Sequence, residues 1–152
     1  MRIAIGADHA GLEMKRDLAA YLAKGGHEVI DVGAFTAAPV DYPDIAEGVA
    51  QSVRNGQADR GIVVCGSGVG AAMAACKFPG IRACVCHDVF SARQAVEHDD
   101  MNVLCLGSRV IGASVARLLA DTFLAATFSG KQRHIARLEK IDAIESRYSR
   151  EE

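Results

Sequence analysis

The sequence of 152 residues lacks tryptophan, and only 5% of its residues are aromatic. No apolar run approaches the roughly 20 residues that a membrane-spanning helix needs, so a membrane protein is not expected. Basic residues are no more numerous than acidic ones, 17 against 19, and no basic stripe offers a nucleic-acid surface. With half of its residues apolar and 24% charged, the composition is that of an ordinary globular domain. No export signal precedes the first apolar segment, which favours the cytoplasm.

Cysteine is present in an odd number, and most of the cysteines fall in strand-like runs. A disulfide framework is therefore not expected, because free cysteine in such runs behaves as a small hydrophobic residue. The pair Cys84 and Cys86 has no second ligand pair at zinc-like spacing, so we expect no metal site. The five cysteines are Cys65, Cys76, Cys84, Cys86 and Cys105.

Apolar runs and helical periodicities alternate along the chain. Short, continuously apolar strands separated by helices predict a single-domain α/β fold over residues 1–152, a doubly wound αβα sandwich with a five-stranded parallel sheet, similar to the Rossmann fold. The strands are predicted at 2–7, 28–32, 62–65, 82–86 and 102–106. The helices are predicted at 11–24, 44–55, 71–75, 89–98, 112–128 and 135–148, with a loop over 33–43.

The third strand runs directly into a glycine-rich turn, Gly66-Ser67-Gly68-Val69-Gly70. Three glycines let the backbone turn tightly and point its N–H groups at one anion, and the helix that follows adds a partial positive charge. Cys65 ends the strand beside this turn, where oriented N–H dipoles favour a thiolate. A cysteine is more often a packed core residue, so the functional hypothesis depends on this position.

In a doubly wound sheet, ligands bind at the carboxyl ends of the strands. This rule predicts that Asp8, His9 and Arg109 lie near the turn, together with His87, Asp88 and Ser108. Asp8 also fits the N-cap of the first helix, and His9 also fits an exposed loop.

The last predicted helix begins with Lys131, Arg133, His134 and Arg137, although the helix dipole favours acidic residues there. Arg133 and Arg137 are four residues apart and share a face, a spacing that suits the binding of one phosphate by two guanidinium groups. The alternative is a solvated basic end with no ligand.

Two other functions fit the turn less well. Gly66, Gly68 and Ala71 match a dinucleotide fingerprint with Asp88 further on, but the turn follows the third strand and the chain has no room for a second domain. A phosphatase-like thiolate loop needs an arginine near its end, and none occurs up to Ala75.

Several motifs together resemble the type B ribose-5-phosphate isomerases, a family that includes the galactose-6-phosphate isomerase subunits. They are D-H-A-G at 8–11, D-Y-P at 41–43, C-G-S-G-V-G at 65–70, H-D-D-M-N-V at 98–103, G-S-R-V at 107–110 and R-H-x-x-R at 133–137. The resemblance implies a cofactor-independent aldose–ketose isomerase of the pentose phosphate pathway. Such an enzyme interconverts D-ribose 5-phosphate and D-ribulose 5-phosphate through an enediolate.

The resemblance also implies roles for individual residues. Cys65 is the base, His98 opens the sugar ring, and the Ser67 hydroxyl helps to stabilise the enediolate. The substrate-binding positions are Asp8, His9, Gly66, Gly68, Val69, Gly70, Asp99, Arg109, Arg133 and Arg137. The active site of a homodimer or homotetramer is shared between subunits, with His98, Asp99 and Arg109 reaching across and the last helix packing on a partner subunit.

Three positions depart from the family pattern or choose between its branches. Asp99 stands where asparagine is usual, Ser67 replaces the more frequent threonine, and Ala71 excludes the branch that uses a glutamate base there. The sequence does not give the length of the pocket, so allose 6-phosphate, galactose 6-phosphate and erythrulose 4-phosphate stay open as substrates, the last two partly because of Asp99. A non-enzymatic sugar-phosphate sensor also stays open, since it would keep the glycine turn and the basic residues but would need no thiol.

Overall fold

The computed structural model describes residues 1–149 and contains one five-stranded parallel sheet, in the order β2-β1-β3-β5-β4. The central strands β1, β3 and β5 are buried almost throughout, which explains their unbroken apolar sequences. The predicted doubly wound sandwich is confirmed. The strands are β1 (Arg2–Ala7), β2 (Glu28–Asp31), β3 (Arg60–Cys65), β4 (Ala83–Val85) and β5 (Val103–Gly107).

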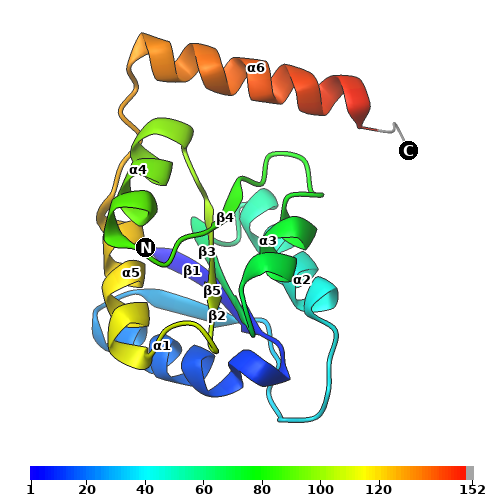
Figure 1. Ribbon diagram of the computed structural model, residues 1–152, viewed down its shortest axis with the longest axis vertical. Helices are drawn as coiled ribbons and strands as arrows, with labels where there is room; N and C mark the ends of the chain where they lie inside the picture. The colour runs from blue at the N-terminus through cyan, green and yellow to red at the C-terminus, as the bar shows by residue number, and fades with distance from the viewer. Residues whose placement is uncertain (150–152) are drawn as a thin grey trace.

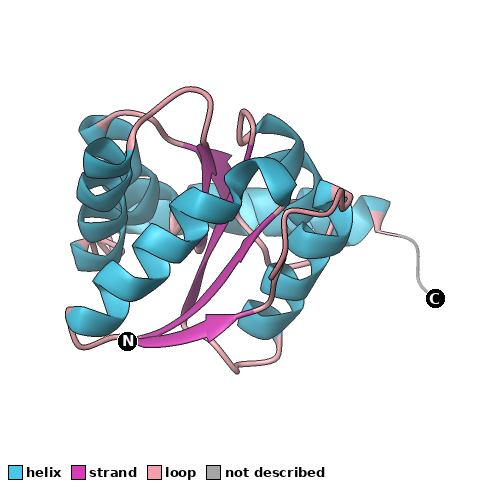
Figure 2. Cartoon of the chain, turned by 90° about the horizontal axis from the view of Figure 1, so that it is seen from below, coloured by secondary structure: helices cyan, strands magenta, loops and turns pink. Residues whose placement is uncertain are grey.

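Helices cover both faces of the sheet (Figures 1 and 2). A single 3₁₀ turn, His9–Gly11, joins β1 to α1. One face packs against α1 (Leu12–Lys24), α4 (Val89–Asp99) and α5 (Ala113–Ala125). The other face packs against α2 (Tyr42–Arg54) and α3 (Val69–Ala75).

Alternate residues of β3 enter the two cores, because successive strand side chains point to opposite faces. Ile62 and Val64 pack with the α1, α4 and α5 side, whereas Val63 and Cys65 pack with the α2 and α3 side. This alternation directs the Cys65 thiol toward α2 and α3.

The helix α5 ends at Ala125, three residues before the predicted end. The half-buried Arg60 side chain donates to the carbonyl oxygens of Phe123 and Ala126, and its guanidinium lies 5.2 Å from the centre of the Phe123 ring. These bonds satisfy carbonyls at the helix end, so the chain can leave the helix there.

The helix α2 begins at Tyr42, within the predicted loop, and carries Pro43 in its first turn. Proline is tolerated at this position because its missing N–H would have no partner inside the helix.

The last helix, α6 (Gln132–Tyr148), lies across one end of the molecule, away from the sheet (Figure 1). His134 is its only buried residue within the described part of the chain. The helix is tied to the body near its two ends: Ser129 N–H donates to the Glu97 carbonyl, and Gly80 N–H donates to Glu145. No helix within residues 1–149 combines the length and apolar character needed to cross a membrane.

Candidate active site

The glycine turn wraps around the Cys65 thiol at the carboxyl end of β3. Cys65 is only 4% exposed, and the Gly68 N–H points at its sulfur with an N to Sγ distance of 3.1 Å. Gly68 has a φ of +80°, which glycine adopts without strain, and this conformation directs the N–H inward. The sulfur is therefore held beside a backbone donor that stabilises negative charge on it.

A cavity of about 310 Å³ opens beside this thiol. Its wall comes from the carboxyl ends of β1, β3 and β5 and from the start of α2, so the structure brings together residues that are far apart in sequence. The lining residues are Asp8, Tyr42, Cys65, Gly66, Ser67, Gly70, Arg109 and Val110.

Arg109 lies over the glycine turn of its own chain. A β-carbon on Gly66 would lie 3.2 Å from Arg109 Nη1, and the Arg109 N–H donates to the Gly66 carbonyl at 3.0 Å. The positive charge at this cavity is thus supplied without a second subunit. The expectation that Arg109 reaches across to a partner's site is not needed to account for its place.

The Ser67 hydroxyl is at the exposed rim of the turn, where it accepts a hydrogen bond from the Val69 N–H at 3.2 Å. Gly107 of β5 supports this position, because a β-carbon there would lie 2.7 Å from the Ser67 backbone. The close approach of β5 requires glycine and holds the turn against the sheet.

Asp8 caps the 3₁₀ turn that precedes α1, whose own N-cap is Gly11, and its side chain also lines the cavity. Its Oδ1 accepts from the N–H groups of Ala10 and Gly11 at 3.0 and 3.1 Å, which leaves Oδ2 available to a ligand. The neighbouring His9 accepts the Val40 N–H at its Nδ1, at 3.2 Å. In the neutral ring, Nε2 then carries the proton and can donate to an anion.

Tyr42 is a cavity residue that the sequence motifs included but that sequence reasoning gave no role. A β-carbon on Gly70 would lie 2.5 Å from Cζ of the Tyr42 ring, so the ring covers this glycine. The signal was the motif D-Y-P before a helix, but only the fold shows that this helix starts beside the turn.

The other polar residues at the strand ends support the backbone and do not line this cavity. His87 Nε2 accepts the Gly107 N–H at 2.9 Å, and the Ser108 hydroxyl donates to the Ala10 carbonyl at 2.8 Å. Asp88 caps α4 by accepting the Ser91 N–H at 2.7 Å, and this bond lowers the pKa of the carboxyl group.

A second cluster joins the end of α4 to the start of α6. The rings of His98 and His134 stack with their centres 4.1 Å apart, and His134 Nδ1 lies 2.5 Å from Ser129 Oγ. Burial lowers the pKa of His134, and the nearby positive charges of His98, Arg133 and other basic residues lower it further.

The two clusters lie at opposite ends of the strands: the cavity at their carboxyl ends and the histidine cluster at their amino ends. Asn102, just after α4, accepts a hydrogen bond from Gly61 at the amino end of β3, whereas Cys65 pairs with Gly107 at the carboxyl end. The six residues of β3 span roughly 16 Å, at about 3.3 Å per step. One chain therefore does not bring the second cluster to Cys65, and the residues it leaves apart are His98, Asp99, Arg133 and Arg137.

Within residues 1–149, no group of three or more histidine, cysteine or acidic side chains is placed to hold a metal ion.

A doubly wound sheet with a thiol, a glycine turn and an arginine around one cavity defines an α/β protein with a candidate anion-binding site. The chain belongs to the ribose/galactose isomerase family, whose model matches residues 3–141. It is 46% identical to ribose-5-phosphate isomerase B of Escherichia coli, over 96% of this chain and 97% of that protein. It is 37% identical to D-erythrulose-4-phosphate isomerase 2 of Mycolicibacterium smegmatis, over 95% of this chain and 97% of that one.

Solved structures give the same result. The ribose-5-phosphate isomerase B of Clostridium thermocellum has a TM-score of 0.96 and 50% identity, covering 98% of this chain and all of that one. The enzyme of Mycoplasma genitalium, whose structure holds ribulose 5-phosphate, has a TM-score of 0.90 and 40% identity, covering 95% and 96% of the two chains.

Proposed function

We propose that this protein is an aldose–ketose isomerase that interconverts D-ribose 5-phosphate and D-ribulose 5-phosphate without a cofactor, as a step of the pentose phosphate pathway in the cytoplasm. The observation that carries the proposal is the Cys65 thiol, held against the Gly68 N–H in a cavity that also contains Arg109. The ribose-5-phosphate isomerase B relatives, at up to 50% identity over nearly the whole chain, support this substrate.

The reaction moves one proton between C2 and C1 of the opened sugar. The Cys65 thiolate removes the proton from C2 of the aldose, the C2 electron pair forms the C1–C2 double bond, and the carbonyl pair moves onto O1. The C2 hydroxyl proton then passes to O1, and the Cys65 thiol returns the carbon-bound proton to C1 as the C2 carbonyl forms. The Gly68 N–H faces the sulfur, so the other backbone N–H groups at 66–70 and the Ser67 hydroxyl stabilise the negative oxygen of that intermediate. The buried thiol and the preformed turn need little reorganisation for this step.

The substrate also needs a ring-opening acid and a phosphate site. His98 is the acid in this proposal, and the phosphate is bound by His9 Nε2–H, Arg109, Arg133 and Arg137. Because His98 and the α6 arginines lie near the amino ends of the strands, far from Cys65, they come from a second copy of the chain in this proposal. We therefore propose a homodimer or homotetramer whose active sites are each shared between two subunits, with α6 packing on the partner.

Exposed apolar side chains support this assembly. On α6, Ile141 and Ile144 are about half exposed, at 47% and 51%. A shallow apolar face also covers α3 and the edge strand β4, and Met73 in it is 67% exposed. Exposed apolar faces are typical of surfaces that associate with another protein. The residues of this face are Val69, Ala72, Met73, Cys76, Ala83, Cys84 and Val85.

The decisive experiment measures turnover of chelator-treated protein on ribose 5-phosphate, erythrulose 4-phosphate, allose 6-phosphate and galactose 6-phosphate. We expect the highest kcat/KM on ribose 5-phosphate and a loss of about a hundredfold or more in kcat for Cys65→Ala, as is typical when a general base is removed. The matched control is Cys86→Ala, which removes a thiol that is also buried but packs on the other face of the sheet, outside the cavity. Preference for another sugar phosphate would change the substrate and keep the mechanism, whereas binding without turnover would favour a sensor.

A further inference from the structure

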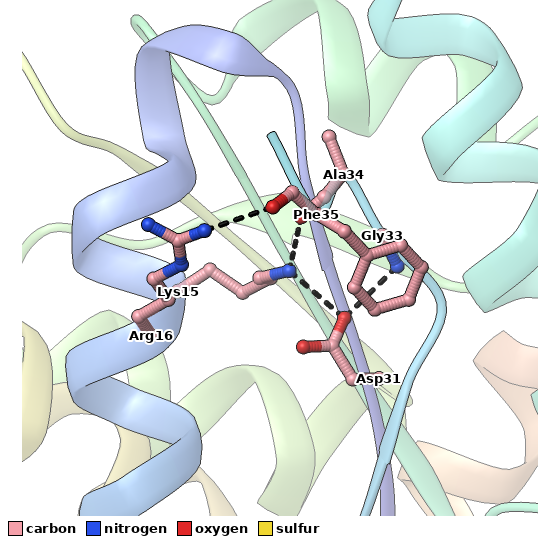
Figure 3. A network of polar contacts seen from close by, with 6 residues as sticks. All are labelled: Lys15, Arg16, Asp31, Gly33, Ala34 and Phe35. Carbon is pink, nitrogen blue, oxygen red and sulfur yellow. Dashed lines mark hydrogen bonds and ion pairs between the residues drawn. The ribbon is translucent and has the colours of Figure 1, made fainter. Parts of the chain in front are cut away.

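Lys15 is buried on α1 with only 1% of its surface exposed, an unusual place for a lysine. Its Nζ donates to Asp31 Oδ1 at 2.9 Å and to the Ala34 carbonyl, and it lies 4.9 Å from the centre of the Phe35 ring (Figure 3). The three N–H donors of the ammonium group thus meet a carboxylate, a carbonyl and an aromatic face.

All three partners belong to the end of β2 or to the segment after it. Asp31 Oδ1 also accepts the Gly33 N–H at 2.9 Å, and Arg16 donates to the Phe35 carbonyl at 2.8 Å (Figure 3). We call residues 32–41 the connecting segment. It has no helix or strand of its own, so its polar groups depend on such side-chain partners. Lys15 thus fixes the start of the connecting segment to α1.

Near its start and near its end, the connecting segment contacts residues adjacent in the chain to Asp8 of the cavity wall. Gly33 and Ala34 exchange hydrogen bonds with Ala7, the residue before Asp8, at 2.7 and 2.6 Å. Further on, the Val40 N–H donates to His9 Nδ1. The segment then leads into Tyr42, whose ring covers Gly70 of the glycine turn.

We infer that Lys15 is a positioning residue for substrate binding: it anchors the connecting segment and thereby orients His9 and Tyr42 at the cavity. The inference rests on the proposed function. Cys65 and the glycine turn are held in place by contacts between β3 and β5, and Lys15 takes no part in these contacts. The loss of the Lys15 ammonium group should therefore weaken binding of the sugar phosphate more than it slows proton transfer.

Lys15→Met tests this role, because methionine keeps an unbranched apolar stem and loses both hydrogen bonds. The side chain of Asp31 is 32% exposed, so water can solvate the carboxylate that loses its partner, and the variant is expected to fold. The matched control is Lys24→Met, the same change at an exposed lysine in the last turn of α1.

For Lys15→Met on ribose 5-phosphate, we expect KM to rise about tenfold and kcat to stay within about threefold, the pattern of lost substrate binding. Lys24→Met should leave both constants within about twofold. A second variant, Phe35→Ala, removes a ring that is 64% exposed, so it cannot disrupt the core, and it should raise KM in the same direction by a smaller factor.

Hydrogen exchange read by mass spectrometry measures the anchor itself, with or without turnover. Exchange over residues 33–41 should be at least tenfold faster in Lys15→Met, and exchange over β3 should be unchanged. Unchanged exchange over 33–41, or an unchanged KM with only a lower melting temperature, would overturn the inference. A wild-type protein that is inactive on every sugar phosphate would instead refute the proposed function, and the exchange result would still decide the role of Lys15.

Discussion

A mixed dimer of two inactive variants should regain activity if the catalytic residues of one site come from different chains. The two variants are Cys65→Ala and His98→Ala, co-expressed with different affinity tags so that the mixed dimer can be isolated. Each variant alone should lose about a hundredfold or more in kcat, since every site lacks either the base or the acid.

The expected magnitude follows from the separation of the two clusters. Cys65 lies at the carboxyl end of β3, and His98 lies near the amino end of that strand, which is roughly 16 Å long. Within one chain, no side chain is long enough to bring His98 to Cys65. In a twofold-symmetric mixed dimer, one site receives both intact residues and the other receives neither. The mixed dimer should therefore show about half of the wild-type kcat per dimer, measured as ribulose 5-phosphate formed from ribose 5-phosphate.

The control mixes Cys65→Ala with Asp8→Asn, two changes in the same half-site, and asparagine keeps the capping oxygen. This dimer has no site with both residues intact, so it should show no more than half of the activity of the Asp8→Asn homodimer. If the first mixed dimer is as inactive as its parent variants, the shared site is wrong and His98 acts within one chain or not at all.

Three further changes test separate parts of the structure. Phe123→Ala empties a fully buried site under Arg60 and should lower the free energy of unfolding by about 3 to 5 kcal/mol in urea titrations; a loss below about 1 kcal/mol would contradict this packing. Asp99→Asn should leave ribose 5-phosphate turnover intact or raise it, and a loss of more than about tenfold, or 1.4 kcal/mol in the barrier, would mean that the carboxylate takes part in the reaction. The lowered pKa of His134 means that its side chain binds fewer protons in the folded state than in the unfolded state, so the stability of the fold should fall as the pH drops below about 6.5. In melting experiments between pH 7.5 and 5.5, His134→Phe should show a weaker fall in stability than the wild type. Equal slopes would show that another group controls the pH dependence.

Sequence alone predicted the local elements and their order well. The central strands were readable because burial on both faces leaves continuous apolar runs, and the glycine turn was readable because a tight backbone path beside a thiol requires those residues. The motifs at 8–11, 65–70 and 107–110 were expected to meet because parallel strands present their carboxyl ends at one edge. In the structure Asp8, Cys65 and Arg109 do line one cavity.

Sequence patterns failed where contacts between distant segments decide the outcome. The early end of α5 depends on Arg60, which is 63 residues away from Phe123 in the chain. Tyr42 and Lys15 gave no clear functional signal, since a tyrosine at a helix start and a lysine on an amphipathic helix are ordinary surface residues. Only the packing of α1 and the connecting segment shows what these two side chains contact.

The sequence by itself determined the class of fold and the chemistry available at the glycine turn, because both depend on local apolar patterns and on residue types adjacent in the chain. The tertiary structure decided which of those residues share a cavity. It placed Arg109 over the turn and put His98, Arg133 and Arg137 at the opposite end of the strands. The physical reason is that the length of β3 separates the loops at the carboxyl ends of the strands from the loops at their amino ends. No local sequence pattern records that distance.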